Sequence, residues 1–174
     1  MVAGACGLVQ TAPMTDPVQR VFRFSSPAET RAFAEHLAPS LRPGDTILLA
    51  GGLGAGKSHF ARSVIQARLA DAGLTEDVPS PTFTLVQTYH DRRCEIWHAD
   101  LYRLNDVTEM FELGLQEAFE TAICLVEWPD RLDDLAPAGA LTLTFEMTDQ
   151  SGERIATASY ASGRWQRVLE WVNA

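Results

Sequence analysis

The chain has 174 residues, a net charge of −9 and apolar residues at 46% of its positions, a composition typical of one globular domain of ordinary size. It contains no run of about eighteen apolar residues that could span a bilayer. Its 14 lysines and arginines are too few for the broad basic surface that autonomous nucleic-acid binding requires. We therefore expect a soluble protein that does not bind a membrane and reaches any nucleic acid through a partner.

Cysteine usage and the N-terminal segment bear on the compartment. Cys6, Cys94 and Cys124 are odd in number and far apart, which favours a reducing compartment over a disulfide framework. The first residues carry no basic side chain ahead of their short apolar stretch, unlike a signal or transit peptide. We expect a cytoplasmic protein in which residues 1–17 form a flexible arm and residues 18–174 form the domain.

The first part of the domain predicts a helix between two strands. The stretch VFRFS favours a strand, after which Ser26 is a helix N-cap, with Pro27 at the first helical position and Glu29 closing a capping box. This helix is predicted to run to about Ala38. Residues 45–51 (DTILLAG) form an apolar, β-branched run that ends in glycines, as expected of a central parallel strand covered on both faces.

The rest of the chain predicts further strands and short helices. Residues 82–90 predict one strand and CEIWHADLYR another that ends near Asp100, whereas DVTEMFELGLQEAF predicts one or two short helices broken at Gly114. The apolar strand AICLVEW stops at Pro129. ALTLTFEM and RIATASY alternate apolar and polar residues, which favours antiparallel strands, and Trp165 begins the apolar face of a closing helix. The predicted fold class is a single-domain α/β three-layer sandwich of the P-loop NTPase type, with a mostly parallel central sheet and antiparallel C-terminal strands.

A phosphate-binding loop is predicted between the strand DTILLAG and a helix from Lys57 to about Ala72. Its spacing is GxxxxGK[ST], in which Gly51 and Gly56 permit backbone conformations that let successive N–H groups converge on a triphosphate. Lys57 would supply positive charge to the β- and γ-phosphates, and the Ser58 hydroxyl suits a Mg²⁺ ion. No Asn-Lys-x-Asp string that would select guanine occurs, which favours ATP.

Acidic residues end two of the predicted strands. Glu127 follows four apolar residues, the position of the acid that holds the magnesium shell or orients a water in P-loop proteins, with a surface glutamate as the alternative. Asp100 either converges on the same site or caps the following turn. Ser80, Thr82 and Thr84 in PSPTFT lie on a segment typical of a switch loop that meets the γ-phosphate, or of a simple loop.

These stretches occur together in the order and at the spacing of one family. They are LGAGKS at 53–58, SPTFTLV at 80–86, HADLYRL at 98–104, Glu112 with the Leu-Gly pair ending at Gly114, and VEWPDRL at 126–132. On these residues the chain resembles the bacterial TsaE (YjeE) ATPases of tRNA threonylcarbamoyladenosine biosynthesis. The resemblance extends over residues 22–168.

The resemblance implies a function beyond what the loop alone predicts. It implies a small, Mg²⁺-dependent ATPase, weak by itself and regulated by its partners TsaB and TsaD. In the family these proteins, with TsaC supplying threonylcarbamoyl-adenylate, modify adenosine 37 of ANN-decoding tRNAs. The TsaE component is required for turnover in bacteria but does not itself transfer the threonylcarbamoyl group, and the tRNA would be reached through the complex.

The resemblance also implies roles for residues at matching positions. Lys57, Asp100 and Glu127 would be catalytic, with Asp100 near the γ-phosphate or its water. Ser58 and Glu127 would hold Mg²⁺. The nucleotide-binding residues would be Leu53, Gly54, Ala55, Gly56, Lys57, Ser58, Ser26, Thr30, Thr82, Gly152 and Arg154.

The expected contacts to the base rest on two short segments. Ser26 and Thr30 occupy the region before and within the first helix that contacts the base in the family. Gly152 and Arg154 occupy the region of a Gly-Arg pair near the late strands, although Glu153 separates them here.

Three further positions qualify the resemblance. Gly52 stands where family loops usually carry Asp, and His59 stands where Thr is common. Trp128 would lie beside the site, either as a contact to a partner or nucleotide or as a packed strand-end aromatic. Two other functions remain open: a small-molecule P-loop kinase, and an assembly factor that ATP clamps without hydrolysis.

Overall fold

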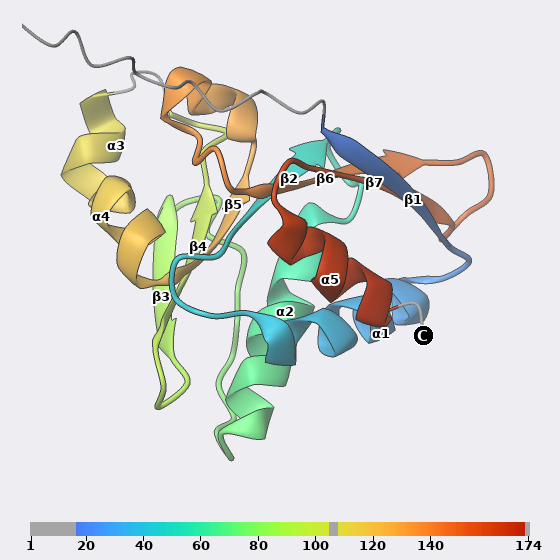
Figure 1. The fold of residues 1–174 in the computed structure, drawn as a ribbon, viewed down its shortest axis with the longest axis horizontal. Coiled ribbons are helices and arrows are strands. Elements are labelled where there is room, and N and C mark those ends of the chain that lie inside the picture. The colour runs from blue at the N-terminus through green and yellow to red at the C-terminus, as the bar shows by residue number, and fades with distance from the viewer. Residues whose placement is uncertain (1–16, 105–107, 173–174) are drawn as a thin grey trace, which may run out of the picture.

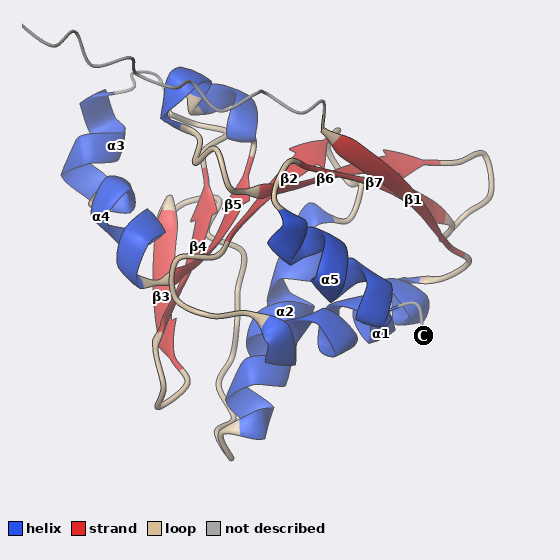
Figure 2. Ribbon diagram, in the orientation of Figure 1, coloured by secondary structure: helices blue, strands red, loops and turns tan. Residues whose placement is uncertain are grey.

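A computed structural model describes residues 17–104 and 108–172 of the chain. All of the predicted N-terminal arm except Pro17 therefore lies outside the described residues. The described part forms one seven-stranded sheet with helices on both faces (Figures 1 and 2). None of its helices combines the length and the apolar character needed to cross a membrane.

Helices and strands alternate as far as Asp71, as in an α/β fold, and are followed by two strands, two short helices, three strands and a last helix. They are β1 (Val18–Phe24), α1 (Pro27–Leu37), β2 (Thr46–Gly51), α2 (Lys57–Asp71), β3 (Val86–His90), β4 (Glu95–Asp100), α3 (Thr108–Leu113), α4 (Leu115–Thr121), β5 (Ile123–Glu127), β6 (Leu141–Met147), β7 (Arg154–Tyr160) and α5 (Gly163–Val172).

The sheet has the strand order β1-β7-β6-β2-β5-β4-β3. Its centre is parallel, because β2 pairs in parallel with both β5 and β6, and β5 pairs in parallel with β4. Both edges are antiparallel: β7 pairs in antiparallel with β6 and with β1, and β3 pairs in antiparallel with β4. The predicted fold class is confirmed, with the refinement that β6 belongs to the parallel centre and that β1 completes the antiparallel edge.

Two hydrophobic clusters, one on each face, make this a three-layer fold. Along β2, Ile47 and Leu49 face the cluster beneath α1, α2 and α5, whereas Leu48 faces the cluster beneath α4. Figure 1 shows α1, α2 and α5 gathered on one side of the sheet and α3 and α4 on the other. Both faces of β2 are therefore buried, which explains its continuous apolar run.

Local predictions are confirmed at the helix starts and corrected at one strand. Ser26 accepts a hydrogen bond from the Glu29 N–H at 3.3 Å, and Gly114, with φ at 75°, separates α3 from α4. The strand predicted at residues 82–90 begins only at Val86. The residues before it form a turn, closed by the N–H of Leu85, which donates to the carbonyl of Pro81 at 2.7 Å.

Candidate nucleotide-binding site

The loop between β2 and α2 has the backbone geometry of a phosphate cradle. Gly51 has a φ of 127°, and a Cβ there would lie 2.3 Å from the carbonyl oxygen of Phe145 in β6. Gly56, with a φ of 110°, is the N-cap of α2. The first glycine is required by the close approach of two strands, and the second turns the chain into the helix, whose N-terminal N–H groups favour an anion.

Lys57 reaches back over the loop and is held by neutral groups. Its side chain is 4% exposed, and Nζ donates to the carbonyl oxygens of Gly51 and Gly52, both at 2.8 Å. Nζ also lies 3.9 Å from the ring centroid of Trp128, whose left-handed backbone (φ 62°) follows the end of β5. Burial lowers the pKa of Lys57, although the charges of Glu127 and Asp100 oppose that shift. The ammonium is thus partly desolvated and positioned to bind an anion.

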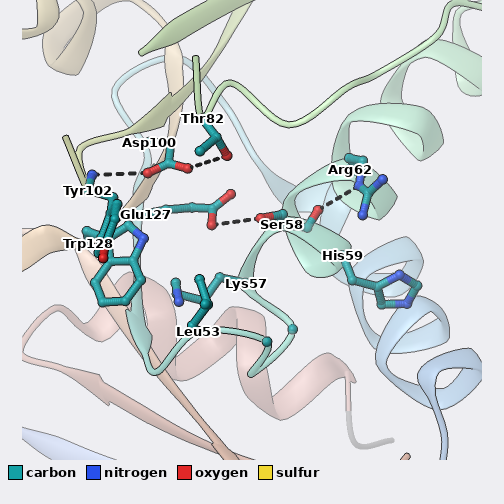
Figure 3. Close-up of a pocket in the computed structure, with 12 residues that line it drawn as sticks. Leu53, Lys57, Ser58, His59, Arg62, Thr82, Asp100, Tyr102, Glu127 and Trp128 are labelled. Carbon is teal, nitrogen blue, oxygen red and sulfur yellow. Dashed lines mark hydrogen bonds between the residues drawn. The ribbon is translucent and has the colours of Figure 1, made fainter. Parts of the chain in front are cut away.

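The two predicted acids lie side by side. Asp100 ends β4 and Glu127 ends β5, and the parallel register pairs them directly. Both are buried. The Ser58 hydroxyl donates to Glu127 Oε2 at 2.8 Å, so that the first turn of α2 meets the end of β5 (Figure 3). Parallel strands bring their carboxyl ends to one edge of the sheet, where α/β proteins bind ligands.

Asp100 is oriented by hydrogen bonds to both of its carboxylate oxygens. Thr82 Oγ1 donates to Oδ2 at 2.9 Å, and the N–H of Tyr102 donates to Oδ1 at 3.0 Å (Figure 3). The hydroxyls of Ser80 and Thr82 lie 2.9 Å apart. The segment SPT is therefore connected directly to the acid, as a loop that senses the occupant of the site would be.

A cavity of about 300 Å³ lies between these elements. Figure 3 shows Arg62 and His59 on the opposite side of Ser58 from Tyr102 and Trp128. The cavity is lined by Leu53, Gly54, Gly56, Lys57, Ser58, His59, Arg62, Thr82, Asp100, Tyr102, Glu127 and Trp128.

The remaining predicted nucleotide contacts lie beside this cavity rather than in its wall. The Ser26 hydroxyl caps α1, and the Thr30 hydroxyl is buried with no hydrogen-bond partner among the described residues. A Cβ on Gly152 would lie 3.7 Å from the ring of Pro27, so the turn before β7 lies against the start of α1. The three residues thus lie in one neighbourhood.

Arg154 contacts the phosphate loop itself. Its Nε donates to the carbonyl of Ala55 at 3.0 Å and its Nη2 to that of Gly54 at 3.2 Å. Because the C=O and N–H of one peptide unit point in opposite directions, holding the Ala55 carbonyl directs the N–H of Gly56 away from Arg154. Arg154 therefore orients the loop from the side opposite to the N–H of Gly56.

Sequence reasoning assigned no role at the site to His98 or to His59. His98 is fully buried, and its Nε2 lies 2.9 Å from Glu127 Oε1. The position of His98 could have been predicted from the alternation of side chains along a strand. His98 precedes Asp100 by two residues and so faces the same side of the sheet. His59 Nε2 lies 2.9 Å from the carbonyl of Pro27 and connects the phosphate loop helix to α1.

The residues present suit Mg²⁺ rather than a dedicated protein metal cage. No group of three or more His, Cys, Asp or Glu side chains is placed to hold a metal within the ranges that the structure describes. The Ser58 hydroxyl and the Glu127 carboxylate are neighbouring hard oxygen donors. Mg²⁺ usually takes one or two such protein ligands and completes its shell with phosphate oxygens and water.

Comparisons with known proteins agree with this geometry. The sequence profile of the threonylcarbamoyl adenosine biosynthesis protein TsaE matches residues 24–156. A tRNA threonylcarbamoyladenosine biosynthesis protein TsaE of Rickettsia felis is 39% identical over 123 residues, 71% of this chain and 70% of the relative. The protein of that name in Bacillus subtilis is 34% identical over 153 residues, 87% and 92% of the two chains. The crystal structure of Bacillus subtilis YdiB superposes with a TM-score of 0.73 at 29% identity, covering 90% of this chain and 95% of YdiB. The chain belongs to the TsaE family.

Proposed function

We propose that this protein is the ATP-binding and ATP-hydrolysing component of the machinery that forms threonylcarbamoyladenosine at position 37 of tRNA, acting with TsaB and TsaD. The observation that carries the chemistry is the in-register pair of Asp100 and Glu127 beside the phosphate loop, with Ser58 bonded to Glu127. The names of its relatives support the pathway.

The chain's own groups divide the work of hydrolysis. ATP would supply the phosphoanhydride bond and Mg²⁺ the neutralising charge. The backbone from Leu53 to Ser58 would hold the phosphates, and Lys57 would exchange its bonds to the loop carbonyls for bonds to phosphate oxygens. Ser58 and Glu127 would hold the metal. Asp100, oriented by Thr82, would position the attacking water and accept its proton.

For the base, we propose the neighbourhood in which the turn at Gly152 lies against the start of α1. Ser26 and Thr30 border this region, and Arg154 holds the adjacent loop. The Ser26 hydroxyl, which caps α1, is better suited to a direct contact than the buried Thr30 hydroxyl.

Features around the mouth of the cavity support regulation by partner proteins. Leu53 at the tip of the loop is 80% exposed, and Phe83, which follows the lining residue Thr82, is 86% exposed. Large apolar side chains that are left exposed next to a binding site are candidates for contact with a partner. The net charge of −9 supports tRNA contact through these partners. The free, buried Cys94 and Cys124 support a cytoplasmic setting.

The test measures threonylcarbamoyladenosine in tRNA after depletion of this protein, with complementation by the wild type or by Lys57→Ala. We expect the modified nucleoside to disappear on depletion and to return only with the wild type. Purified protein mixed with TsaB and TsaD should bind them and hydrolyse ATP faster than Lys57→Ala. Unchanged modification on depletion, or no binding and no excess hydrolysis, would contradict the proposal.

Two further measurements separate the proposal from its alternatives. Transfer of a labelled γ-phosphate to a metabolite instead of to water would indicate a kinase. Glu127→Gln should abolish both hydrolysis and tRNA modification; full modification without hydrolysis would indicate a factor that ATP only clamps.

A further inference from the structure

His98 shares the Glu127 carboxylate with Ser58. His98 Nε2 lies 2.9 Å from Oε1, and the Ser58 hydroxyl donates to Oε2 at 2.8 Å. His98 is 0% exposed and Glu127 is 2% exposed, so water does not compete for the Nε2 contact. His98 lies on the same face of the sheet as Asp100 and two residues before it, so it is further from the carboxyl end of β4, where the site lies. Each carboxylate oxygen thus has its own hydrogen-bond partner.

The other ring nitrogen determines the tautomer of His98. Nδ1 is buried and has no hydrogen-bond partner among the described residues. A proton on Nδ1 would be a buried donor without an acceptor, which costs about 1–3 kcal/mol. A proton on Nε2 instead bonds to an ionised carboxylate, the stronger kind of hydrogen bond. The neutral ring with its proton on Nε2 satisfies both constraints, so His98 donates to Glu127.

We propose that His98 is a positioning residue that orients the Glu127 carboxylate for Mg²⁺. The proposal rests on the proposed function, since it assigns a support to the metal-binding acid of that site. Because His98 holds Oε1, the Glu127 side chain cannot rotate freely. Oε2 therefore stays directed at Ser58. Hydrogen-bonded supports of metal-binding carboxylates typically contribute about 10- to 100-fold to metal affinity. His98 itself is not among the residues that line the cavity, so it would act on the metal through Glu127.

The test follows binding of a fluorescent, non-hydrolysable ATP analogue, first in EDTA and then across a Mg²⁺ titration. His98→Leu should raise the half-saturating Mg²⁺ concentration about 10- to 100-fold. Binding in EDTA should stay within about twofold, because the loop and Lys57 are unchanged. His98→Gln, whose amide nitrogen reaches the position of Nε2, should restore most of the Mg²⁺ affinity. His98→Asn, whose shorter amide cannot reach Glu127, should not.

Controls separate positioning from folding. His36 lies on the exposed surface of α1, and its ring bonds only to a backbone carbonyl; His36→Leu should leave the Mg²⁺ titration unchanged. In a Glu127→Gln background, His98→Leu should add no further change, because the carboxylate that it supports is absent. If His98→Leu fails to fold, the contrast between His98→Gln and His98→Asn carries the test.

The outcomes distinguish this inference from the proposed function. Absence of nucleotide binding by the wild type, or wild-type binding that ignores Mg²⁺, would contradict the proposed function. Normal wild-type binding with an unshifted Mg²⁺ titration in His98→Leu would overturn the role of His98 alone. An equal loss of binding with and without Mg²⁺ would also overturn it, because it would show a merely structural residue.

Discussion

The helix α2 carries a buried cation near each end, and the two are held in opposite ways. Arg68 donates from Nε to Asp91 at 2.7 Å, from Nη1 to the carbonyls of Ala38 and Leu41, and from Nη2 to the sulfur of Cys94. Lys57 forms no ion pair with any carboxylate that the structure describes, and bonds only to two carbonyls of its own loop.

The difference separates a cation that holds elements of the fold together from a cation that we propose binds phosphate. Arg68 uses its guanidinium to join the hairpin of β3 and β4 to the segment after α1, and both Arg68 and Asp91 are buried. The bonds of Lys57 are to neutral oxygens at the wall of a cavity, where an anion can replace them. Removing the counter-ion of Arg68 should therefore lower the free energy of unfolding, whereas removing the ammonium of Lys57 should lower the rate of ATP hydrolysis.

The largest effect is expected from Asp91→Ala. This change leaves the buried Arg68 without its counter-ion, which typically costs about 3–5 kcal/mol in the free energy of unfolding. Thermal unfolding should then shift down by roughly 6–20 °C for a domain of this size. The matched control is Asp71→Ala, which breaks the exposed pair of Asp71 and Arg93 and should cost less than about 1 kcal/mol. Equal losses in the two variants would contradict the distinction.

The complementary change is Lys57→Met, which keeps the stem of the side chain and removes the ammonium. ATP hydrolysis in the presence of the partners should fall about 10²- to 10³-fold, the usual effect of removing one preorganised electrostatic contact. The free energy of unfolding should change by less than about 1 kcal/mol, because water at the cavity can satisfy the freed carbonyls. A stability loss as large as that of Asp91→Ala would show that Lys57 is structural too.

Gly51→Ala tests the backbone that positions Lys57. The new methyl would lie 2.3 Å from the Phe145 carbonyl, at a φ of 127° that other residues rarely adopt. We expect a loss of about 1–3 kcal/mol in the free energy of unfolding. Weaker nucleotide binding should accompany it, because relieving the clash must separate β2 from β6 at the loop. Urea unfolding and a fluorescent nucleotide titration measure the two effects, and retention of both properties would contradict this account.

The phosphate loop and the two acids were predictable from sequence because each has a local signature. The glycine spacing predicts the loop, and an apolar run that ends in a carboxylate predicts Glu127 and Asp100 at strand ends. The late start of β3 at Val86 was not predictable from the apolar pattern TFTLV. The turn before it depends on a bond from Leu85 to Pro81 and on the contact of Thr82 with Asp100, which the strand pattern does not contain.

Contacts that join distant segments were the hardest to predict. The bond between Ser58 and Glu127 spans 69 positions, and that between Arg154 and Ala55 spans 99. The pattern of β6 and β7 predicted strands, but which strand lies beside β2 is decided by packing across the whole sheet. His98 illustrates the same limit, since its partner Glu127 lies on a neighbouring strand.

A smaller effect is expected in the pH dependence of the free energy of unfolding, through the ion pair of Asp91 and Arg68. Burial alone would raise the pKa of Asp91, but the N–H groups of Cys94 and Arg93, together with Arg68, outweigh it and lower that pKa. A lowered pKa means that this stabilisation is present above the unfolded value near ~3.9 and is lost as pH falls through the folded value. Unfolding free energies measured from pH 6 down should therefore fall less steeply in Asp91→Asn than in the wild type. Parallel curves would contradict this assignment.

The smallest effect is expected where the chain departs from its family, at Gly52. A Cβ at this position meets nothing within 4 Å, and its φ is not left-handed, so Gly52→Asp should change the free energy of unfolding by less than about 0.5 kcal/mol. The new carboxylate would be solvated, leaving the bond from Lys57 to the Gly52 carbonyl in place. We expect hydrolysis within about threefold of the wild type, with Gly52→Ala as the uncharged control. A larger change confined to Gly52→Asp would show that an acid here pairs with Lys57, and the contrast between the two cations of α2 would then be particular to this chain.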